Sequence, residues 1–228
     1  MESGHLELLH PWHHTVAKLL PDLSGAKVLE IGCGRGDFSI WLGRKHPRAL
    51  ITAVDFSDTA IEIARRKLGS DMANVSFQVD DAERLKFSEA TFDYVISCEC
   101  MEHVPHPEVM AKEIRRVLRP NAKFLLTTEN YLNGMLLSWA ATWWRNKKFD
   151  SGSGIQPLEN FFLWWRVKRM LERAGLNVDH MESNHFQWLL LPRVTPQKLC
   201  TRDFRSAAWK RLFRPFGRHF TFQGSRRA

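Results

Sequence analysis

Residues that could bind a nucleoside cofactor are grouped in the first quarter of the chain. Gly32, Gly34 and Gly36 follow a short apolar run and precede an amphipathic one. Glycine lets a backbone turn tightly and approach a ligand closely, and a helix that starts there offers free N–H groups. Asp55 ends the next apolar run, where a carboxylate can accept both hydroxyls of a ribose. The pattern therefore predicts a nucleoside cofactor site.

The charge beside the glycines indicates which cofactor fits. A dinucleotide site has a third glycine at the end of G-x-G-x-x-G, and this chain has Asp37 at that position. A carboxylate there would repel a pyrophosphate, whereas it would attract a cofactor that carries an ammonium and a sulfonium. We therefore expect a cationic cofactor rather than NAD.

The segments that must position these residues alternate between strand and helix patterns. Apolar runs predict strands over residues 27–31, 50–54, 75–79, 92–97 and 122–128, with two more near 178 and 188–191. Amphipathic runs predict helices over residues 5–20 with a break at Pro11, from residue 38, and over 57–68, 107–118 and 160–174. Such alternation predicts an α/β fold: a Rossmann-like, doubly wound, seven-stranded and mostly parallel sheet with helices on both faces.

One main domain over residues 1–192 is expected, with two additions. A long connection over residues 131–157 has an apolar helical stripe followed by a Gly- and Ser-rich stretch. Connections of this length are uncommon unless they cover a site, so we expect a lid, with plain packing of an extra helix as the alternative. Residues 193–228 form a basic amphipathic C-terminal extension.

Four segments resemble the motifs of class I S-adenosylmethionine-dependent methyltransferases (methyltransferase type 11/12-like). They are Val28–Gly36, Ala53–Ser57, Val79–Leu85, and Phe92–Ser97 followed by Met101–Val104. The likeness covers roughly residues 25–130, and Asp80 stands where the family commonly has glycine. It implies an enzyme that uses S-adenosylmethionine, and a sheet with one antiparallel strand near its C-terminal edge.

The resemblance also implies a role for each matching residue. The Gly32–Gly36 backbone would approach the methionine part of the cofactor, Asp55 would hold the ribose, and Phe56 would pack on the adenine. Asp81 would accept from the adenine amino group, and Ser97 or Cys98 would border the methyl group. The cofactor-binding residues expected on this basis are Glu30, Gly32, Cys33, Gly34, Gly36, Asp37, Asp55, Phe56, Asp81, Ala82, Ser97 and Cys98.

His103 and Glu102 are the candidate catalytic residues. An imidazole suits proton transfer near neutral pH, although the pair could also cap the following helix. Glu99, Glu102 and His103 have the spacing E-x-x-E-H, which looks like the metal-binding segment of ubiquinone-pathway O-methyltransferases. A divalent metal is possible but not favoured, because a fourth ligand would have to come from Glu159 or His185, and neither lies in a matching motif.

The positive charge of the chain is concentrated at its end. The net charge is +8, and residues 193–228 hold ten Lys or Arg and one acidic residue. A basic amphipathic helix over residues 203–216 could contact an anionic membrane or a nucleic acid, or pack its aromatic side on the domain; nucleic acid is the unlikely partner. Without a signal peptide, a membrane span or paired cysteines, the chain is expected to be cytoplasmic and possibly peripheral to a membrane.

Taken together, these features predict an S-adenosylmethionine-dependent methyltransferase. The acceptor is expected to be a hydroxyl on a small molecule, sugar or lipid-like natural product, because the Trp-rich insertion suggests an apolar cover. One alternative is a metal-assisted RNA 2′-O-methyltransferase. Another is a non-catalytic scaffold that binds S-adenosylmethionine.

Overall fold

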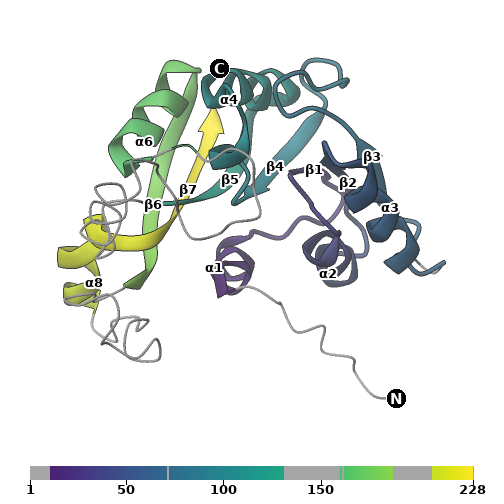
Figure 1. The fold of residues 1–228 in the computed structure, drawn as a ribbon, viewed down its shortest axis with the longest axis horizontal. Helices are drawn as coiled ribbons and strands as arrows, with labels where there is room; N and C mark the ends of the chain where they lie inside the picture. The colour runs from purple at the N-terminus through teal and green to yellow at the C-terminus, as the bar shows by residue number, and fades with distance from the viewer. Residues whose placement is uncertain (1–10, 71, 131–159, 161, 187–206, 228) are drawn as a thin grey trace, which may run out of the picture.

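The protein folds around one seven-stranded sheet (Figure 1). The computed structural model describes residues 11–70, 72–130, 160, 162–186 and 207–227. The strand order is β3-β2-β1-β4-β5-β7-β6, and β7 is antiparallel to both of its neighbours. The strands are β1 (Lys27–Ile31), β2 (Leu50–Asp55), β3 (Val75–Val79), β4 (Phe92–Cys98), β5 (Leu118–Glu129), β6 (Leu176–Phe186) and β7 (Gly217–Arg226).

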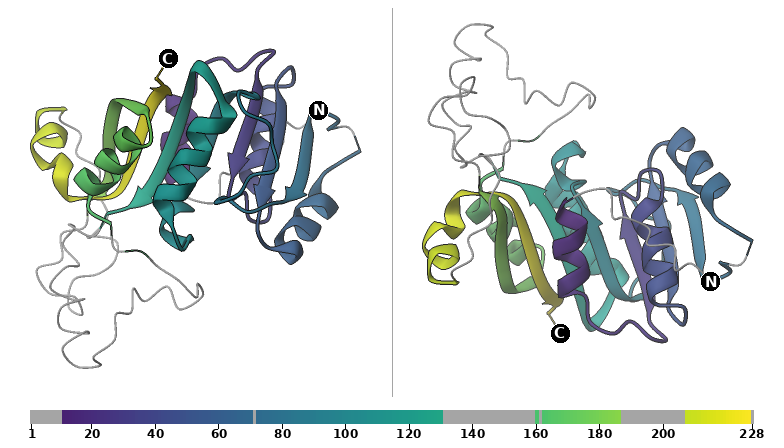
Figure 2. Two further views of the ribbon diagram at one scale, coloured as in Figure 1. Left: turned by 90° about the horizontal axis from the view of Figure 1, so that it is seen from above. Right: turned by 90° about the horizontal axis from the view of Figure 1, so that it is seen from below.

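Helices cover both faces of the sheet. They are α1 (Pro11–Leu19), α2 (Asp37–Lys45), α3 (Asp58–Lys67), α4 (Pro107–Val117), α6 (Trp164–Arg173) and α8 (Ala207–Phe213), with short 3-10 helices η1 (Met101–His103) and η2 (Arg214–Phe216). The two views of Figure 2 show α1 (purple) and α4 (teal) on opposite sides of the sheet. None of the helices that the structure describes has the length and apolar character needed to cross a bilayer.

Two apolar cores hold these layers together. One packs α4 and α6 on the sheet through residues such as Ile114 and Val167, and the other packs α1, α2 and α3 through residues such as Val16 and Ile61. Ser57 caps the N-terminus of helix α3, because its side chain accepts a hydrogen bond from the Ala60 N–H at 3.2 Å. The sheet is therefore buried on both faces, as parallel sheets require.

The expected doubly wound sheet and its antiparallel strand are confirmed, but the last strand comes from another segment. The strand expected near residues 188–191 lies outside the described residues. Strand β7 comes from residues 217–226, within the segment that the sequence predicts to be a separate basic extension after residue 192, so this part of the extension belongs to the sheet. Phe220 and Phe222 are fully buried on one face, and this alternation drives strand formation there.

One helix boundary also differs from the expectation, because helix α6 begins at Trp164 rather than at residue 160. Pro11 is the first residue of helix α1, and residues 1–10 lie outside the described part of the chain. Proline fits the first turn of a helix, where its missing N–H has no partner to lose. The lid-like insertion at 131–157 lies outside the described residues.

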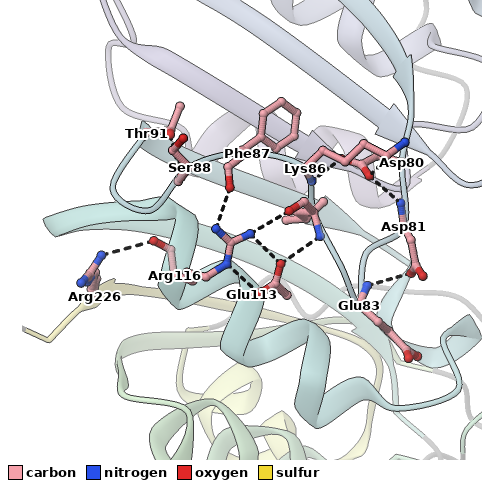
Figure 3. A network of polar contacts seen from close by, with 11 residues as sticks. Asp80, Asp81, Glu83, Lys86, Phe87, Ser88, Thr91, Glu113, Arg116 and Arg226 are labelled. Carbon is pink, nitrogen blue, oxygen red and sulfur yellow. Dashed lines mark hydrogen bonds and ion pairs between the residues drawn. The ribbon is translucent and has the colours of Figure 1, made fainter.

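An ion pair on α4 fixes the loop that follows β3. The Arg116 guanidinium donates to the carbonyls of Phe87 and Leu85 at 2.6 and 2.8 Å and to the Glu113 carboxylate at 2.7 Å (Figure 3). Glu113 in turn accepts the Leu85 N–H at 2.9 Å, and the nearby guanidinium lowers the pKa of Glu113. These bonds tie the loop after β3, which begins near Asp81 at the edge of the site described next, to helix α4.

Candidate cofactor and methyl-transfer site

A cavity of about 790 Å³ opens at the carboxyl ends of β1, β2 and β4. In doubly wound sheets this edge is where ligands bind. The cavity is lined by His13, Glu30, Ile31, Gly32, Cys33, Gly34, Arg35, Asp37, Phe38, Val54, Asp55, Phe56, Asp80, Asp81, Ala82, Cys98, Glu99, Cys100, His103, Val104 and Pro105. The structure therefore brings ten of the twelve predicted cofactor residues to one cavity, and Gly36 and Ser97 are the other two.

Gly32 occupies a position that only glycine fits. Its φ is +77°, in the left-handed region, and a Cβ there would lie 2.5 Å from the Cys100 Sγ atom. Its N–H donates to the Val54 carbonyl at 2.8 Å, which ties the glycine loop to β2. The loop thus lies close to the loop after β4, and its backbone forms one wall of the cavity.

Asp55 joins the glycine loop to the start of α3. One carboxylate oxygen accepts the Gly34 N–H at 2.8 Å, and the other accepts the Ser57 N–H at 3.0 Å. Each carboxylate oxygen has two acceptor positions, so both keep capacity for a ligand hydroxyl. Asp55 lines the cavity, which is the position expected for a residue that binds a ribose.

The lining of the cavity is acidic and has one exposed aromatic ring. Six of the lining residues are Asp or Glu, whereas one is Arg. Phe56 lies beside Asp55 with 72% of its surface exposed, so its ring can stack on a planar base. This donor set fits a nucleoside that carries positive charge, as S-adenosylmethionine does, and does not fit a pyrophosphate.

The two neighbouring aspartates after β3 play different parts. Asp80 is buried, and its carboxylate accepts the N–H groups of Asp81 and Lys86, each at 3.0 Å. Asp81 is exposed at the cavity, with its carboxylate accepting the Glu83 N–H at 2.9 Å. Asp80 therefore shapes the loop, and all three residues Asp80, Asp81 and Ala82 line the cavity.

Asp37 contributes less negative charge to the cavity than the sequence suggests. Its two carboxylate oxygens accept from the Lys67 ammonium group at 2.7 and 2.8 Å. Asp37 is the first residue of α2, where its charge also favours the helix N-terminus. The carboxylate is thus partly neutralised before any ligand binds.

Glu30 is the most deeply buried carboxyl group of the cavity wall. It is 2% exposed and accepts a hydrogen bond from the Ser39 hydroxyl at 2.5 Å. Burial raises the pKa of Glu30 to about 7, against the lowering effect of the Ser39 hydrogen bond. The group can therefore change its charge near neutral pH when a cation binds beside it.

Cysteine thiols and a buried serine surround the end of β4. Burial raises the pKa of Cys100 to about 12 and raises that of Cys98 well above its usual range, so both thiols stay protonated. Ser97 is buried, and its hydroxyl donates to the Ile31 carbonyl at 3.1 Å rather than facing the cavity. Of the two residues expected to border the methyl group, the structure places Cys98 in the cavity wall.

The two predicted catalytic residues point to different places. His103 lines the cavity and is partly exposed. Glu102 is 1% exposed, accepts from the Thr128 hydroxyl at 3.0 Å and is not among the lining residues. Burial raises the pKa of Glu102 well above its usual range. Glu102 therefore lies in the core away from the cavity, whereas His103 is the residue of the two that could contact a substrate.

Three further residues lie at or near the site but are not among the predicted site residues. His13 on α1 lines the cavity and stacks on Phe38 at a ring distance of 4.8 Å. Cys100 also lines the cavity, and the signal for it was its place in the loop directly after β4. His219 on β7 lies 3.1 Å from the Glu99 carboxylate, and no motif marked it because its strand was not predicted.

Comparisons with known proteins agree with this geometry. A family model for a methyltransferase domain matches residues 28–121. A ubiquinone biosynthesis O-methyltransferase of Coxiella burnetii is 33% identical over 125 residues, which cover 55% of this chain and 53% of the relative. A fatty-acid O-methyltransferase of Mycolicibacterium smegmatis is 35% identical over 116 residues, covering 51% and 41%.

Solved structures agree on the fold. A SAM-dependent methyltransferase from Methanosarcina mazei superposes with a TM-score of 0.65 at 18% identity, covering 96% of this chain and 98% of that one. Residues 28–121 therefore form a class I S-adenosylmethionine-dependent methyltransferase domain. The aligned segment spans about half the length of the ubiquinone-pathway relative.

The raised pKa of Glu30 predicts a pH dependence of stability. The native state prefers the protonated form, so its stabilisation is present below about pH 4.5 and is lost as the pH rises towards 7. A shift of this size corresponds to about 3 kcal/mol. Glu30→Gln should remove this loss, because the amide still accepts from Ser39. Urea unfolding at intervals from pH 4.5 to 8 should show the difference between the two proteins growing with pH.

Glu62→Gln is the matched control, because Glu62 is an exposed residue that pairs with Arg66 on the surface of α3. It should leave the pH profile of the wild type unchanged. A Glu30→Gln profile parallel to that of the wild type would contradict the assignment.

Proposed function

We propose that the protein transfers a methyl group from S-adenosylmethionine to a hydroxyl oxygen of a small or lipid-like acceptor. The observation that carries the proposal is the acidic cavity in which Asp55 bridges two loops beside the exposed ring of Phe56. This arrangement supplies a ribose acceptor, a stacking surface and negative charge for a cationic cofactor. The match of residues 28–121 to a methyltransferase domain supports it.

The nature of the acceptor is inferred from the relatives and from the cavity wall. The two relatives described above are named as O-methyltransferases, one of ubiquinone biosynthesis and one of fatty acids. Beyond His103 the wall continues with the apolar residues Val104 and Pro105. An apolar wall next to a group that can take a proton suits a hydroxyl carried on a hydrophobic molecule.

The residues of the chain position the reactants and manage one proton. When bound, S-adenosylmethionine supplies an electrophilic methyl group whose bond to sulfur breaks with the electron pair staying on sulfur. Asp55, Phe56 and Asp81 would hold the nucleoside. His103 would accept the proton of the acceptor hydroxyl as the oxygen forms its new bond to carbon. Cys98 and Cys100, held as neutral thiols, would form a wall that does not compete as a nucleophile.

Replacement of His103 tests the proposed base. His103→Ala should lower kcat by about 100-fold or more, because general base catalysis contributes at that scale, while S-adenosylmethionine binding changes little. Transfer of a labelled methyl group to hydroxylated quinol and fatty-acid acceptors, with calorimetry for the cofactor, measures both quantities. His180→Ala is the matched control, because His180 is an exposed histidine on β6.

Unchanged turnover in the His103 variant would contradict its role. Methylation of RNA instead of these acceptors, or cofactor binding without turnover on any acceptor, would favour the alternatives of an RNA methyltransferase or a non-catalytic scaffold.

We also propose that the C-terminal segment contacts an anionic membrane surface. Trp209 and Leu212 on α8 are 51% and 64% exposed, and Phe216 just after it is 48% exposed, with Arg211 nearby in the sequence. Exposed aromatic and aliphatic groups beside basic residues favour a membrane interface over packing on the domain.

Vesicle binding tests this contact. Trp209→Ala/Leu212→Ala should weaken co-sedimentation with phosphatidylglycerol vesicles about tenfold, because it removes apolar area that would enter the interface. Leu50→Ala is the control, since Leu50 is an equally exposed apolar residue at the start of β2. Equal binding by wild type and the double variant would refute the contact.

A further inference from the structure

Three potential metal ligands converge at the carboxyl end of β4. Glu99 follows β4, Glu129 ends β5, and His219 lies on β7. Glu129 and His219 face each other in the antiparallel pairing of β5 with β7. One ligand atom from each of the three residues lies within 4.8 Å of the other two, and the His219 Nδ1 atom is 3.1 Å from a Glu99 carboxylate oxygen.

The positions of these ligands are set by the sheet rather than by a mobile loop. Glu99 adopts a φ of +47°, and its N–H is held by both the carbonyl and the hydroxyl oxygen of Thr127, each at 3.1 Å. His219 is 7% exposed, and Glu99 and Glu129 are partly buried. Two of the ligands lie on the paired strands β5 and β7, and the third directly follows β4, so the three are already close together and binding would cost little rearrangement.

We propose that Glu99, Glu129 and His219 bind one divalent cation of the Mn²⁺ type at the edge of the methyl-transfer cavity. Two carboxylates and one imidazole are a donor set that first-row divalent ions accept, with remaining positions open for water or a substrate oxygen. Glu99 belongs both to this set and to the cavity wall. An ion held by this set would therefore lie next to the cavity wall at Glu99.

This set differs from the one that the E-x-x-E-H spacing suggests. Glu102 lies in the core against Thr128 and does not line the cavity. Within the part of the chain that the structure describes, one group of three potential metal ligands lies close together, and it consists of Glu99, Glu129 and His219. Glu159 and the side chain of His185, the other ligands considered, fall outside that part.

The role of the ion rests on the proposed O-methyl transfer, but its binding does not. A hydroxyl that coordinates a divalent ion loses its proton more readily. Glu99 shares the cavity wall with Cys98 and His103, so an acceptor in the cavity could reach the ion there. The ion would thus favour hydroxyl acceptors over amines or carbon acceptors.

The test is a titration of metal-free full-length protein with Mn²⁺ alone, followed by electron paramagnetic resonance of the free ion. The expected result is one Mn²⁺ bound per chain, with competition by Mg²⁺. His219→Gln and Glu129→Gln should each weaken binding at least tenfold. His103→Ala should retain the wild-type affinity, since His103 belongs to the other candidate set.

The conservative Gln replacements keep the size and hydrogen-bonding capacity of the sites, and circular dichroism with S-adenosylmethionine calorimetry confirms that each variant is folded. Absence of a bound ion in folded protein would overturn the proposal. So would binding that is lost in His103→Ala but kept in His219→Gln. The affinity for S-adenosylmethionine is measured separately from the affinity for Mn²⁺. A protein that binds no metal ion can therefore be distinguished from one that lacks the proposed methyltransferase function.

Discussion

The carboxylate of Asp55 holds together the two loops that make the cofactor site. Through the N–H groups of Gly34 and Ser57 it joins the turn after β1 to the start of α3. Backbone donors at such turns must find partners, and one acidic side chain at the end of β2 satisfies two of them while keeping acceptor capacity for a ligand. Together with the bonds from the Gly32 and Cys33 N–H groups to the Val54 carbonyl, this contact sets how the glycine loop lies at the end of β2.

The acidic character of the cavity is a second constraint, because carboxylates that lie close together repel one another. Glu30 keeps its proton up to about pH 7 because burial disfavours the charged form, and Asp37 is neutralised by Lys67. A cation placed among these groups would favour their charged forms and so bind more tightly. The proposed divalent site uses the same principle at the neighbouring edge, where Glu99 and Glu129 meet His219.

The sequence predicted the parts of the fold and site that depend on local patterns. The glycine loop, Asp55 and the strands β1 to β5 follow from periodicity and turn chemistry within a few residues. Strand β7 was missed because its basic residues obscured the alternation of Phe220 and Phe222. Glu102 is buried and His103 lines the cavity because of the orientation of a single 3-10 turn, which the sequence does not show. His219 lies near Glu99 only because strands that are distant in the sequence pair in the sheet, and the sequence does not show this contact either.

The most direct test of this account is a calorimetric titration of the folded protein with S-adenosylmethionine, S-adenosylhomocysteine and NAD, repeated with Asp55→Asn. The account predicts micromolar binding of the first two ligands and none of NAD. It also predicts at least a tenfold loss in the variant, about 1.4 kcal/mol, because one acceptor for the ribose is weakened. Binding of NAD in place of S-adenosylmethionine, or no binding of either by folded protein, would contradict it.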